Sequence, residues 1–437
     1  MKTIQKFKVY ALSLLFLLMM GCEGLLDVNN PNNVLEEDLS NPKSAANIAN
    51  GALFTVAQGI GYVLAPYEAA TDEVRWIGSR DAWGQLDQGK ISDFNNEFTD
   101  AAWPFISEGR WMADRAVILL EGFDATGSLT NRLDLARAYL YAALVRVAIG
   151  DMFDDFVYSD KTVAGTPIGE TNMSSVYDQA TALLAKAKTI AESGTTATHQ
   201  ETRRRVMGLT ARARHAKDIW SKVNPKGTVP SAPYAGSAQT VADAQAALAL
   251  MTGDYKWNLD YFSALTFNEM AWEAVGRSEL ACLGKGSALP GNPIDPIPND
   301  PVSGTADVRI TNIINDFTSV PKYQDRYSPL TMTSAREMHL IIAEGALAAG
   351  NALGCITSLN TVRAMDNLAP YLVTDDAGTA LKHERRANLY LQGRRLADMY
   401  RFGVQDTRWL PGSEARTTAG VFLPITIQER RSNPNVQ

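Results

Sequence analysis

The strongest constraint on the fold lies in residues 334–363, which read as two helices joined by a tight turn. The first arm places small and apolar residues on one helical face: Met338, Ile341, Ile342, Gly345 and Ala349. The turn contains Gly350 and Asn351, which both tolerate the left-handed conformation that ends helices. The second arm carries Ile356, Leu359 and Val362 as its buried residues. We therefore predict a helical hairpin in this part of the chain.

Other segments show the same helical period. Apolar stripes occur within residues 45–56, 103–120, 133–147, 176–190 and 203–223. Small residues, above all Ala, lie at the stripe centres, which is typical of tetratricopeptide-type stacking of helix pairs. We predict a mainly α fold of four degenerate tetratricopeptide-like helical hairpins. We also expect Trp257, Tyr261, Phe262 and Trp272 to be helix-spaced core residues.

Long non-periodic stretches separate the helical segments and predict a loop-rich cap. They are residues 59–98, 152–172, 224–240 and 283–305. The last contains Pro290, Pro293, Pro296, Pro298 and Pro301, so it cannot be a helix. Long loops in compact chains are usually functional or disordered, and the aromatic residues here favour ordered loops.

The N-terminus has the pattern of an export signal. Three lysines at positions 2, 6 and 8 precede the apolar run 9–20, which is too short to span a bilayer. The run ends at Gly21 and Cys22, which resembles a bacterial lipobox, and lipidation of Cys22 would anchor the chain to a membrane. An ordinary secretory signal with an incidental cysteine is the alternative. We predict a lipoprotein signal peptide (1–21), a lipidated tether (22–40) and one domain (41–437).

Composition excludes several classes of function. The chain has 41 Lys and Arg against 48 Asp and Glu, a net charge of −7, which disfavours nucleic-acid binding. The run Arg203–Arg205 is expected to be a solvated helix face. The four His residues are dispersed, and no nucleophile elbow, zinc-hydrolase or phosphate-loop motif occurs. We therefore predict no enzyme activity, no metal and no cofactor, and leave open whether Cys282 and Cys355 pair.

The chain resembles the SusD/RagB family in four ordered segments. Residues 336–363 resemble R-x-x-x-L-I-x-A-E-A…G…L-N-x-V-R, and residues 384–403 resemble E-R-R-x-E-L-x-F-E-G-x-R-x-x-D-L-x-R-W-G. Residues 422–435 resemble the closing P-I-P-x-x-E-x-x-x-N-P, and residues 133–151 resemble the family's helical segment ending in F-G-D, with Ile149 in place of Phe.

The resemblance implies a SusD-like fold in 41–437, with an N-terminal part (41–260) and a C-terminal signature part (261–437). It implies an outer-membrane, lipid-anchored and surface-exposed protein. Such a protein captures an oligosaccharide, or a peptide, for a SusC-like TonB-dependent transporter. The alternative is a tetratricopeptide-type scaffold of the transporter complex without its own ligand site. The charged residues of the motifs fall near i, i+4 spacings and are expected to form structural salt bridges, with Arg336, Glu344 and Arg363 tying the last hairpin to its neighbours.

One aromatic loop is the candidate ligand site. Rings can stack on sugar C–H surfaces, and flanking charged groups can hydrogen-bond hydroxyl groups. The predicted ligand-binding residues are Tyr67, Asp72, Arg75, Trp76, Arg80 and Trp83. The alternative is that Trp76 and Trp83 are buried where the loop packs on the helices.

Overall fold

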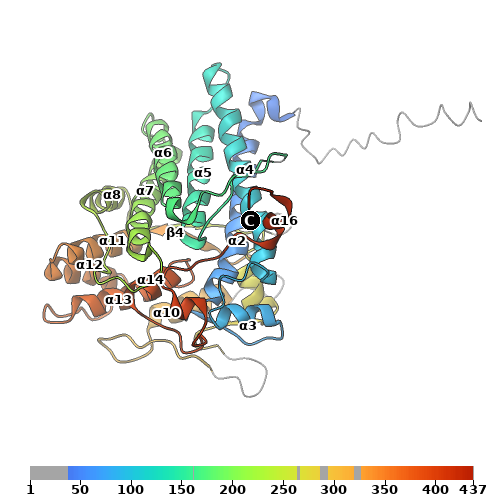
Figure 1. The fold of residues 1–437 in the computed structure, drawn as a ribbon. Helices are drawn as coiled ribbons and strands as arrows, with labels where there is room; N and C mark the ends of the chain where they lie inside the picture. Colours follow the sequence, from blue (N-terminus) through green and yellow to red (C-terminus); the bar gives the residue numbers. More distant parts are fainter. Residues whose placement is uncertain (1–37, 161, 263–265, 286–293, 319–325, 437) are drawn as a thin grey trace, which may run out of the picture.

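The computed structural model describes residues 38–160, 162–262, 266–285, 294–318 and 326–436. Within these residues the protein is built from packed α-helices, and its strands form two small two-stranded sheets (Figure 1). The predicted mainly α class is therefore confirmed.

The N-terminal half is a row of helices, each packed on a chain neighbour. They are α2 (Ala45–Ala69), α4 (Glu97–Ala125), α5 (Arg132–Met152), α6 (Ser175–Ala191), α7 (Ala197–Val223) and α8 (Ala238–Leu248). Two short 3-10 turns, η1 (Asp38–Ser40) and η2 (Pro42–Ser44), precede them. Side chains of Asn96, Asn131, Thr196 and Ser237 accept hydrogen bonds from the first backbone N–H groups of α4, α5, α7 and α8. All five helical stripes predicted in this half are confirmed.

The C-terminal half contains the predicted hairpin, formed by α11 (Ala335–Ala348) and α12 (Ala352–Ala364). Gly350 has φ +78° in the turn, as expected. Asn351 has φ −97° instead of a left-handed conformation, and its side chain caps α12. The other helices are α10 (Val308–Thr318), α13 (Ala377–Asn388), α14 (Arg395–Phe402), α15 (Glu414–Thr417) and α16 (Ile427–Ser432). In Figure 1 the helices α10 to α14 form the lower left of the molecule, beside α7 and α8.

Two antiparallel strand pairs connect distant segments. Strand β1 (Val74–Trp76) pairs with β3 (Leu280–Cys282), and β2 (Lys256–Leu259) pairs with β4 (Leu330–Ser334). The remaining short elements are α3 (Asp81–Asp87), η3 (Glu170–Asn172), α9 (Glu269–Ala271) and the π-helical turn η4 (Trp272–Gly276). The two buried thiols, Cys282 and Cys355, are both free, which settles the question left open by the sequence.

The prediction of a loop from residue 59 was wrong for its first part, because α2 continues through Gly59 and Gly61 to Ala69. Both glycines allow close packing: a Cβ atom on Gly59 would lie 2.7 Å from the Phe105 carbonyl oxygen, and one on Gly61 would lie 2.7 Å from that of Phe267. The helix is long and apolar enough to cross a membrane, but 61% of its most apolar window is buried inside the protein. It is a core helix of the fold.

The helix expected around Trp257 was also wrong. Trp257 lies in strand β2 and is 2% exposed, and Tyr261 follows the strand and is also buried. Phe262 is 53% exposed, so it is not a core residue. A spacing of four or five residues between aromatics fitted a helix, but the pairing of β2 with β4 decides the local conformation.

Charged side chains link the C-terminal helices in the interior. Glu344, which is fully buried, pairs with Arg385 and Arg401 and also contacts His215. Arg363 binds Asp300 at 2.6 Å and Glu384 at 2.9 Å. The predicted short-range salt bridges are confirmed for Asp398 and Arg401, which pair at 2.7 Å within α14, but most of these contacts join residues far apart in sequence. The expected linking role is confirmed for Glu344, for Arg363 and for Arg336, which pairs with Asp254 and Asp366.

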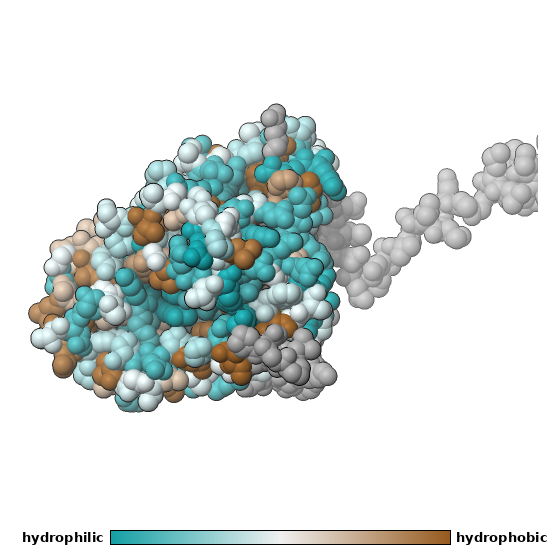
Figure 2. Space-filling view, turned by 60° about the horizontal axis from the view of Figure 1, so that its bottom comes forward, coloured by the Kyte–Doolittle hydropathy of each residue, from teal (hydrophilic) through white to brown (hydrophobic). Residues whose placement is uncertain are grey.

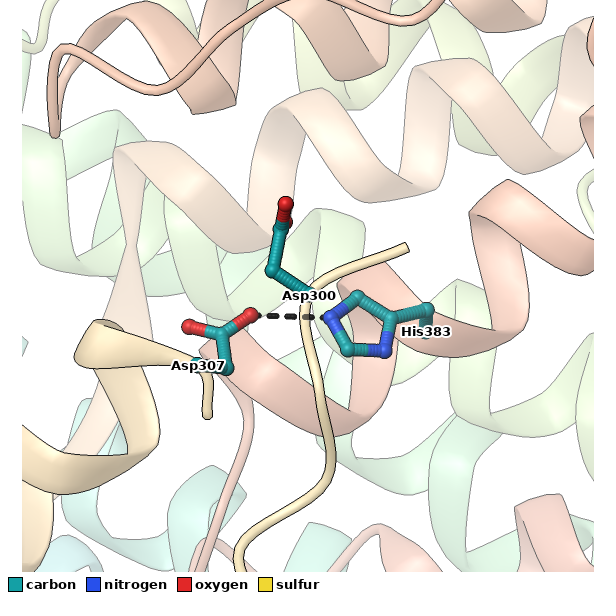
Figure 3. Close-up of side chains that lie close together, drawn as sticks. All are labelled: Asp300, Asp307 and His383. Atoms are coloured by element: carbon teal, nitrogen blue, oxygen red, sulfur yellow. Dashed lines mark hydrogen bonds and ion pairs between the residues drawn. The ribbon is translucent and has the colours of Figure 1, made fainter. Parts of the chain in front are cut away.

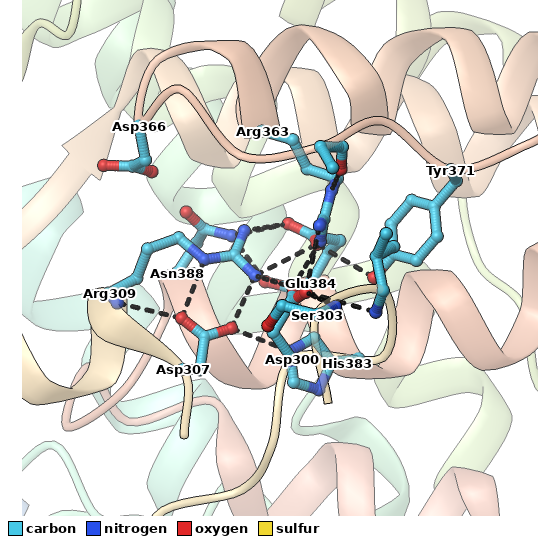
Figure 4. A network of polar contacts seen from close by, with 12 residues as sticks. Asp300, Ser303, Asp307, Arg309, Arg363, Asp366, Tyr371, His383, Glu384 and Asn388 are labelled. Carbon is cyan, nitrogen blue, oxygen red and sulfur yellow. Dashed lines mark hydrogen bonds and ion pairs between the residues drawn. The ribbon is translucent and has the colours of Figure 1, made fainter. Parts of the chain in front are cut away.

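A second buried group, at the start of α10, has the donor atoms of a metal site. Asp300, Asp307 and His383 place their ligand-type atoms within 4.8 Å of one another (Figure 3). However, Arg309 donates to both oxygens of Asp307, and Arg363 donates to both oxygens of Asp300 (Figure 4). Two guanidinium groups occupy the lone pairs and repel a cation, so we assign this cluster a structural role.

Candidate functional site

Two of the predicted ligand-binding residues belong to the core. Tyr67 lies in α2 and is 0% exposed, and burial raises the pKa of its hydroxyl. Trp83 in α3 is 1% exposed and stacks on Phe98, with ring centroids 3.7 Å apart. An aromatic ring that is buried to this extent cannot contact a ligand with its face. The prediction that Tyr67 and Trp83 contact ligand is therefore corrected, and the alternative of a buried Trp holds for Trp83.

Asp72 is held by two arginines of the C-terminal half. Its carboxylate oxygens accept hydrogen bonds from Arg395 at 2.6 and 2.8 Å, and Arg386 lies 3.0 Å away. Burial would raise the pKa of Asp72, but the adjacent Arg395 lowers it to about 2. The residue joins the loop after α2 to α13 and α14, so its contacts are structural.

The other three predicted residues are partly exposed. Arg75 and Trp76 lie in β1; Arg75 pairs with Asp295 at 3.1 Å, and the Trp76 ring covers Gly84 of α3. Arg80 precedes α3, forms an ion pair with Glu97 and lies over the Phe98 ring at 4.6 Å. No comparison tests whether these side chains bind a ligand, so that assignment stays a prediction.

The structure adds a group of half-buried aromatic side chains beside this loop. We call Tyr62, Phe105, Phe267, Trp272 and Tyr327, together with Arg326, the aromatic patch. Tyr62 of α2 stacks on Phe105 of α4 at a centroid distance of 3.9 Å. Arg326 lies 3.7 Å from the Trp272 ring centre and 5.1 Å from that of Phe267. Flat rings and a guanidinium plane thus gather from four separate segments.

Acidic groups lie next to the aromatic patch. Glu269 interacts electrostatically with Arg326, Arg277 and Arg80, which connects the patch to the predicted loop. Glu269 and Glu273 share a hydrogen bond, and burial together with the charge of Glu269 raises the pKa of Glu273 to about 7. Such a pair holds a proton near neutral pH, so one carboxyl can donate a hydrogen bond while the other accepts.

Sequence reasoning missed the aromatic patch for a specific reason. The glycines at 59 and 61 were taken as loop residues, but they let α4 and the segment of Phe267 approach α2 closely. Tyr62 therefore meets Phe105 because of helix packing, which a single-segment pattern does not show. The signal that could have found it is the Gly-x-Gly spacing immediately before an aromatic residue in an Ala-rich helix.

The face that includes the lower ends of the helices is shown in Figure 2. Hydrophilic residues cover much of its centre, and hydrophobic residues lie among them in small groups. Exposed apolar residues that occur singly are normal for protein surfaces. The hydrophobic residues seen on this face therefore do not form one large patch of the kind that indicates a protein–protein interface.

The architecture defines the class of this protein: a mainly α protein of consecutively packed helices, with irregular segments and short strand pairs inserted between them.

No family model and no curated protein matches the chain. Solved structures do. A SusD superfamily protein from Bacteroides fragilis matches with a TM-score of 0.62 at 14% identity, covering 91% of this chain and 99% of that chain.

Two other solved structures agree with this match. A SusD superfamily protein from Bacteroides thetaiotaomicron gives a TM-score of 0.60 at 13% identity, covering 91% of this chain and 99% of its own. A SusD-like carbohydrate binding protein from Bacteroides vulgatus gives 0.61 at 12% identity, covering 91% and 97%. The chain therefore has the SusD-like fold, as its sequence motifs led us to expect.

Proposed function

We propose that this chain is a surface-exposed binding lipoprotein of the outer membrane, which captures a nutrient and delivers it to a SusC-like TonB-dependent transporter. An oligosaccharide is the favoured ligand and a peptide the second choice. The observation that carries the proposal is the SusD-like fold over 91% of the chain, shared with a protein named for carbohydrate binding. Binding and release, without covalent chemistry, would be its whole mechanism.

The ligand would lie across Arg75, Trp76 and Arg80 and the neighbouring aromatic patch. Half-buried rings such as Tyr62 and Trp272 suit stacking on the C–H faces of sugar rings. Guanidinium groups of Arg80 and Arg326 can donate to hydroxyl oxygens, and the half-buried Glu269, whose partner Glu273 is fully buried behind it, can accept from a hydroxyl group. Such a mixture of flat apolar faces and polar groups orients a neutral polyhydroxyl ligand.

Cys22 would hold the protein at the membrane through acyl chains, with residues 1–21 removed and 22–40 forming a tether ahead of the domain 41–437. Cys22 and the other residues before Asp38 lie outside the described part of the chain, and the tether prediction meets the structure only at η1. The test is Cys22→Ser with membrane fractionation. We expect release from the membrane or loss of processing, and normal processing with full membrane retention would contradict the anchor.

A glycan and peptide binding screen tests the ligand. With the ligand it identifies, Trp76→Ala and Tyr62→Ala should weaken binding about five- to a hundred-fold, because an aromatic platform contributes roughly 1–3 kcal/mol. Trp220→Ala is the matched control, since Trp220 is half-buried on α7 and lies outside the proposed surface. All variants should keep the parent melting temperature.

The screen also separates the proposal from the alternative of a protein-binding scaffold. A scaffold would bind the transporter but no soluble glycan or peptide. Equal binding by the parent, Trp76→Ala and Tyr62→Ala would move the site elsewhere on the molecule, while absence of any ligand together with transporter association would favour the scaffold.

A further inference from the structure

A groove of about 460 Å³ lies at the end of the molecule where the described chain begins, between η1, α2 and α4 (Figure 1). Its apolar lining includes Leu39, Ile48, Trp111, Met112 and Leu119. Of these five side chains only Ile48 is buried; the other four are half-buried and remain accessible. None of them belongs to the aromatic patch or to the predicted ligand-binding residues, so the groove is separate from the ligand surface of the proposed function.

Two further residues describe what the groove can accept. A Cβ atom on Gly51 of α2 would meet no other atom within 4 Å, so the space in front of this glycine is open. Arg115 of α4 is exposed, supplies the one charge in the described lining and has no ion-pair partner among the described residues. Because accessible apolar surface of this kind often marks a contact, the groove suits an apolar segment that also carries an acidic group.

The tether of this chain contains such a segment. Residues 25–28 have the sequence Leu-Leu-Asp-Val, with three apolar side chains and one carboxylate. The stretch 23–37 contains four acidic residues and no lysine or arginine, so its charge is complementary to that of Arg115. The composition of the tether therefore matches both properties of the groove.

The segment is also close enough to reach the groove. The tether leads into η1, whose Leu39 forms part of the groove wall. Residues 29–37 connect the segment to η1 and span about 30 Å when extended, whereas the part of α4 along the groove, residues 111–119, is about 12 Å long. The sequence Asn-Asn-Pro-Asn-Asn at 29–33 favours a turn, so the chain can reverse its direction. A segment attached by so short a linker has an effective concentration of millimolar order, so that weak affinity is sufficient.

We propose that residues 25–28 dock in this groove, with their apolar side chains against Trp111 and Leu119 and their carboxylate beside Arg115. Removal of the apolar side chains from water drives the docking, and the ion pair favours one register of the segment. The inference rests on the tether in the proposed function, but it requires no ligand.

Docking would fix the distance between the domain and the membrane. A free tether formed by residues 22–37 could hold the domain up to about 55 Å from its lipid anchor. With residues 25–28 docked, only residues 22–24 remain between the anchor and the domain, and these span about 10 Å. The end of the molecule that carries η1 would then lie next to the membrane.

A disulfide cross-link tests the placement. Leu26→Cys and Met112→Cys are introduced together into the full chain carrying Cys22→Ser, in which the two remaining native thiols are buried. Mild oxidation should join them within one chain, because a disulfide requires Cα atoms within about 7 Å. The matched control pairs Leu26→Cys with Ile118→Cys, which lies on the same helix, outside the groove lining, and is 59% exposed. The control should form its link roughly tenfold more slowly.

Filling the groove tests the same contact without cysteines. Gly51→Trp places a side chain in the open space, and Gly122→Trp on α4 is its control, since an added Cβ there also meets nothing within 4 Å but lies outside the groove lining. Amide hydrogen exchange of residues 25–28 should be slow in the parent and in Gly122→Trp. In Gly51→Trp it should reach the rate of an unstructured peptide. Arg115→Glu should accelerate it about two- to fivefold, through loss of the ion pair. All three variants should keep the parent melting temperature.

An intramolecular cross-link, together with fast exchange in Gly51→Trp, supports the docking. The proposal is overturned if Met112→Cys links no faster than Ile118→Cys, or if residues 25–28 exchange equally in the parent and in Gly51→Trp. A link that joins two chains would overturn it in favour of an interface between copies, and a groove that serves another protein would give neither signal. Neither measurement needs a ligand or acylation, so docking can fail while the proposed nutrient binding holds, and the reverse.

Discussion

Helix α5 buries Leu, Ala, Val and Tyr side chains along most of its length, whereas α14 buries Arg395, Asp398 and Arg401. The first helix belongs to the N-terminal row α2–α8, and the second to the C-terminal group α11–α14. Apolar packing depends on the shape and volume of the side chains and does not require that particular atoms face one another. A buried ion network depends on each partner being present, because a charge that loses its partner remains in a medium of low dielectric constant.

This difference in buried side chains shows which interactions fix the packing of the helices in each half. Small residues let the N-terminal helices approach closely, so that Gly59 and Gly109 each contact the backbone of the opposing helix. The C-terminal helices are shorter, and specific pairs such as Arg401–Glu344 and Arg385–Asp398 fix how they meet. We expect the two halves to respond differently to loss of a methyl group, loss of a charge and a change in pH.

The largest effect should come from Glu344→Ala. Glu344 accepts from Arg401, His215 and the Ala235 N–H, and Arg385 lies 3.3 Å away, so its removal leaves buried guanidinium groups without a partner. The free energy of unfolding should fall by about 3–5 kcal/mol, measured by urea denaturation. A loss below about 1 kcal/mol would mean that the network does not specify this half.

Leu140→Ala tests the N-terminal half by the same measurement. Leu140 is 1% exposed in α5, and deletion of its side chain should cost about 2–5 kcal/mol through lost burial and the cavity that remains. The loss should not change between low and high salt, because no charge is involved. If the loss of unfolding free energy caused by Leu140→Ala changed with salt as much as the loss caused by Glu344→Ala, the two halves would not differ in the kind of interaction that stabilises them.

Acid should weaken the C-terminal half before the N-terminal row. The pKa of Asp72 is about 2 in the folded protein, against about 3.9 when unfolded, because Arg395 and Arg386 favour its charged form over the opposing cost of burial. The stabilisation is complete above about pH 4 and is lost as the pH falls towards 2; the shift corresponds to at most about 3 kcal/mol. Hydrogen exchange should show α13 and α14 opening first.

Asp72→Asn checks the origin of that acid response. The variant should be less stable than the parent at neutral pH and should show a smaller decrease between about pH 4 and 2. An unchanged decrease in the variant would assign the acid response to other carboxylates, such as Asp300, whose pKa is also lowered to about 2.

The smallest effect should come from Arg132→Ala on the N-terminal row. Arg132 pairs with Asp124 at 2.8 Å, but its side chain is 55% exposed, so solvent screens the interaction. The free energy of unfolding should change by less than about 1 kcal/mol. A larger loss would show that surface pairs, and not only buried ones, contribute to this half.

Much of the fold could be predicted from local pattern. The stripe of α5 and the Gly350–Asn351 turn are properties of short segments, and the structure has both. The candidate site could be predicted only in part. Arg75, Trp76 and Arg80 are partly exposed as a site requires, but the burial of Tyr67 and Trp83 depends on α2 extending to Ala69 and on Phe98 stacking from the next helix.

The sequence by itself determined the helical periods, the turn chemistry and the ordered motifs that indicate a SusD-like fold, because each depends on residues that are neighbours along the chain. Only the tertiary structure decided which charges meet and which rings remain half-exposed. Arg363 and Asp300, or Tyr62 and Phe105, are far apart in sequence and meet only after the helices pack. Their contacts arise from packing geometry, which one-dimensional spacing does not contain.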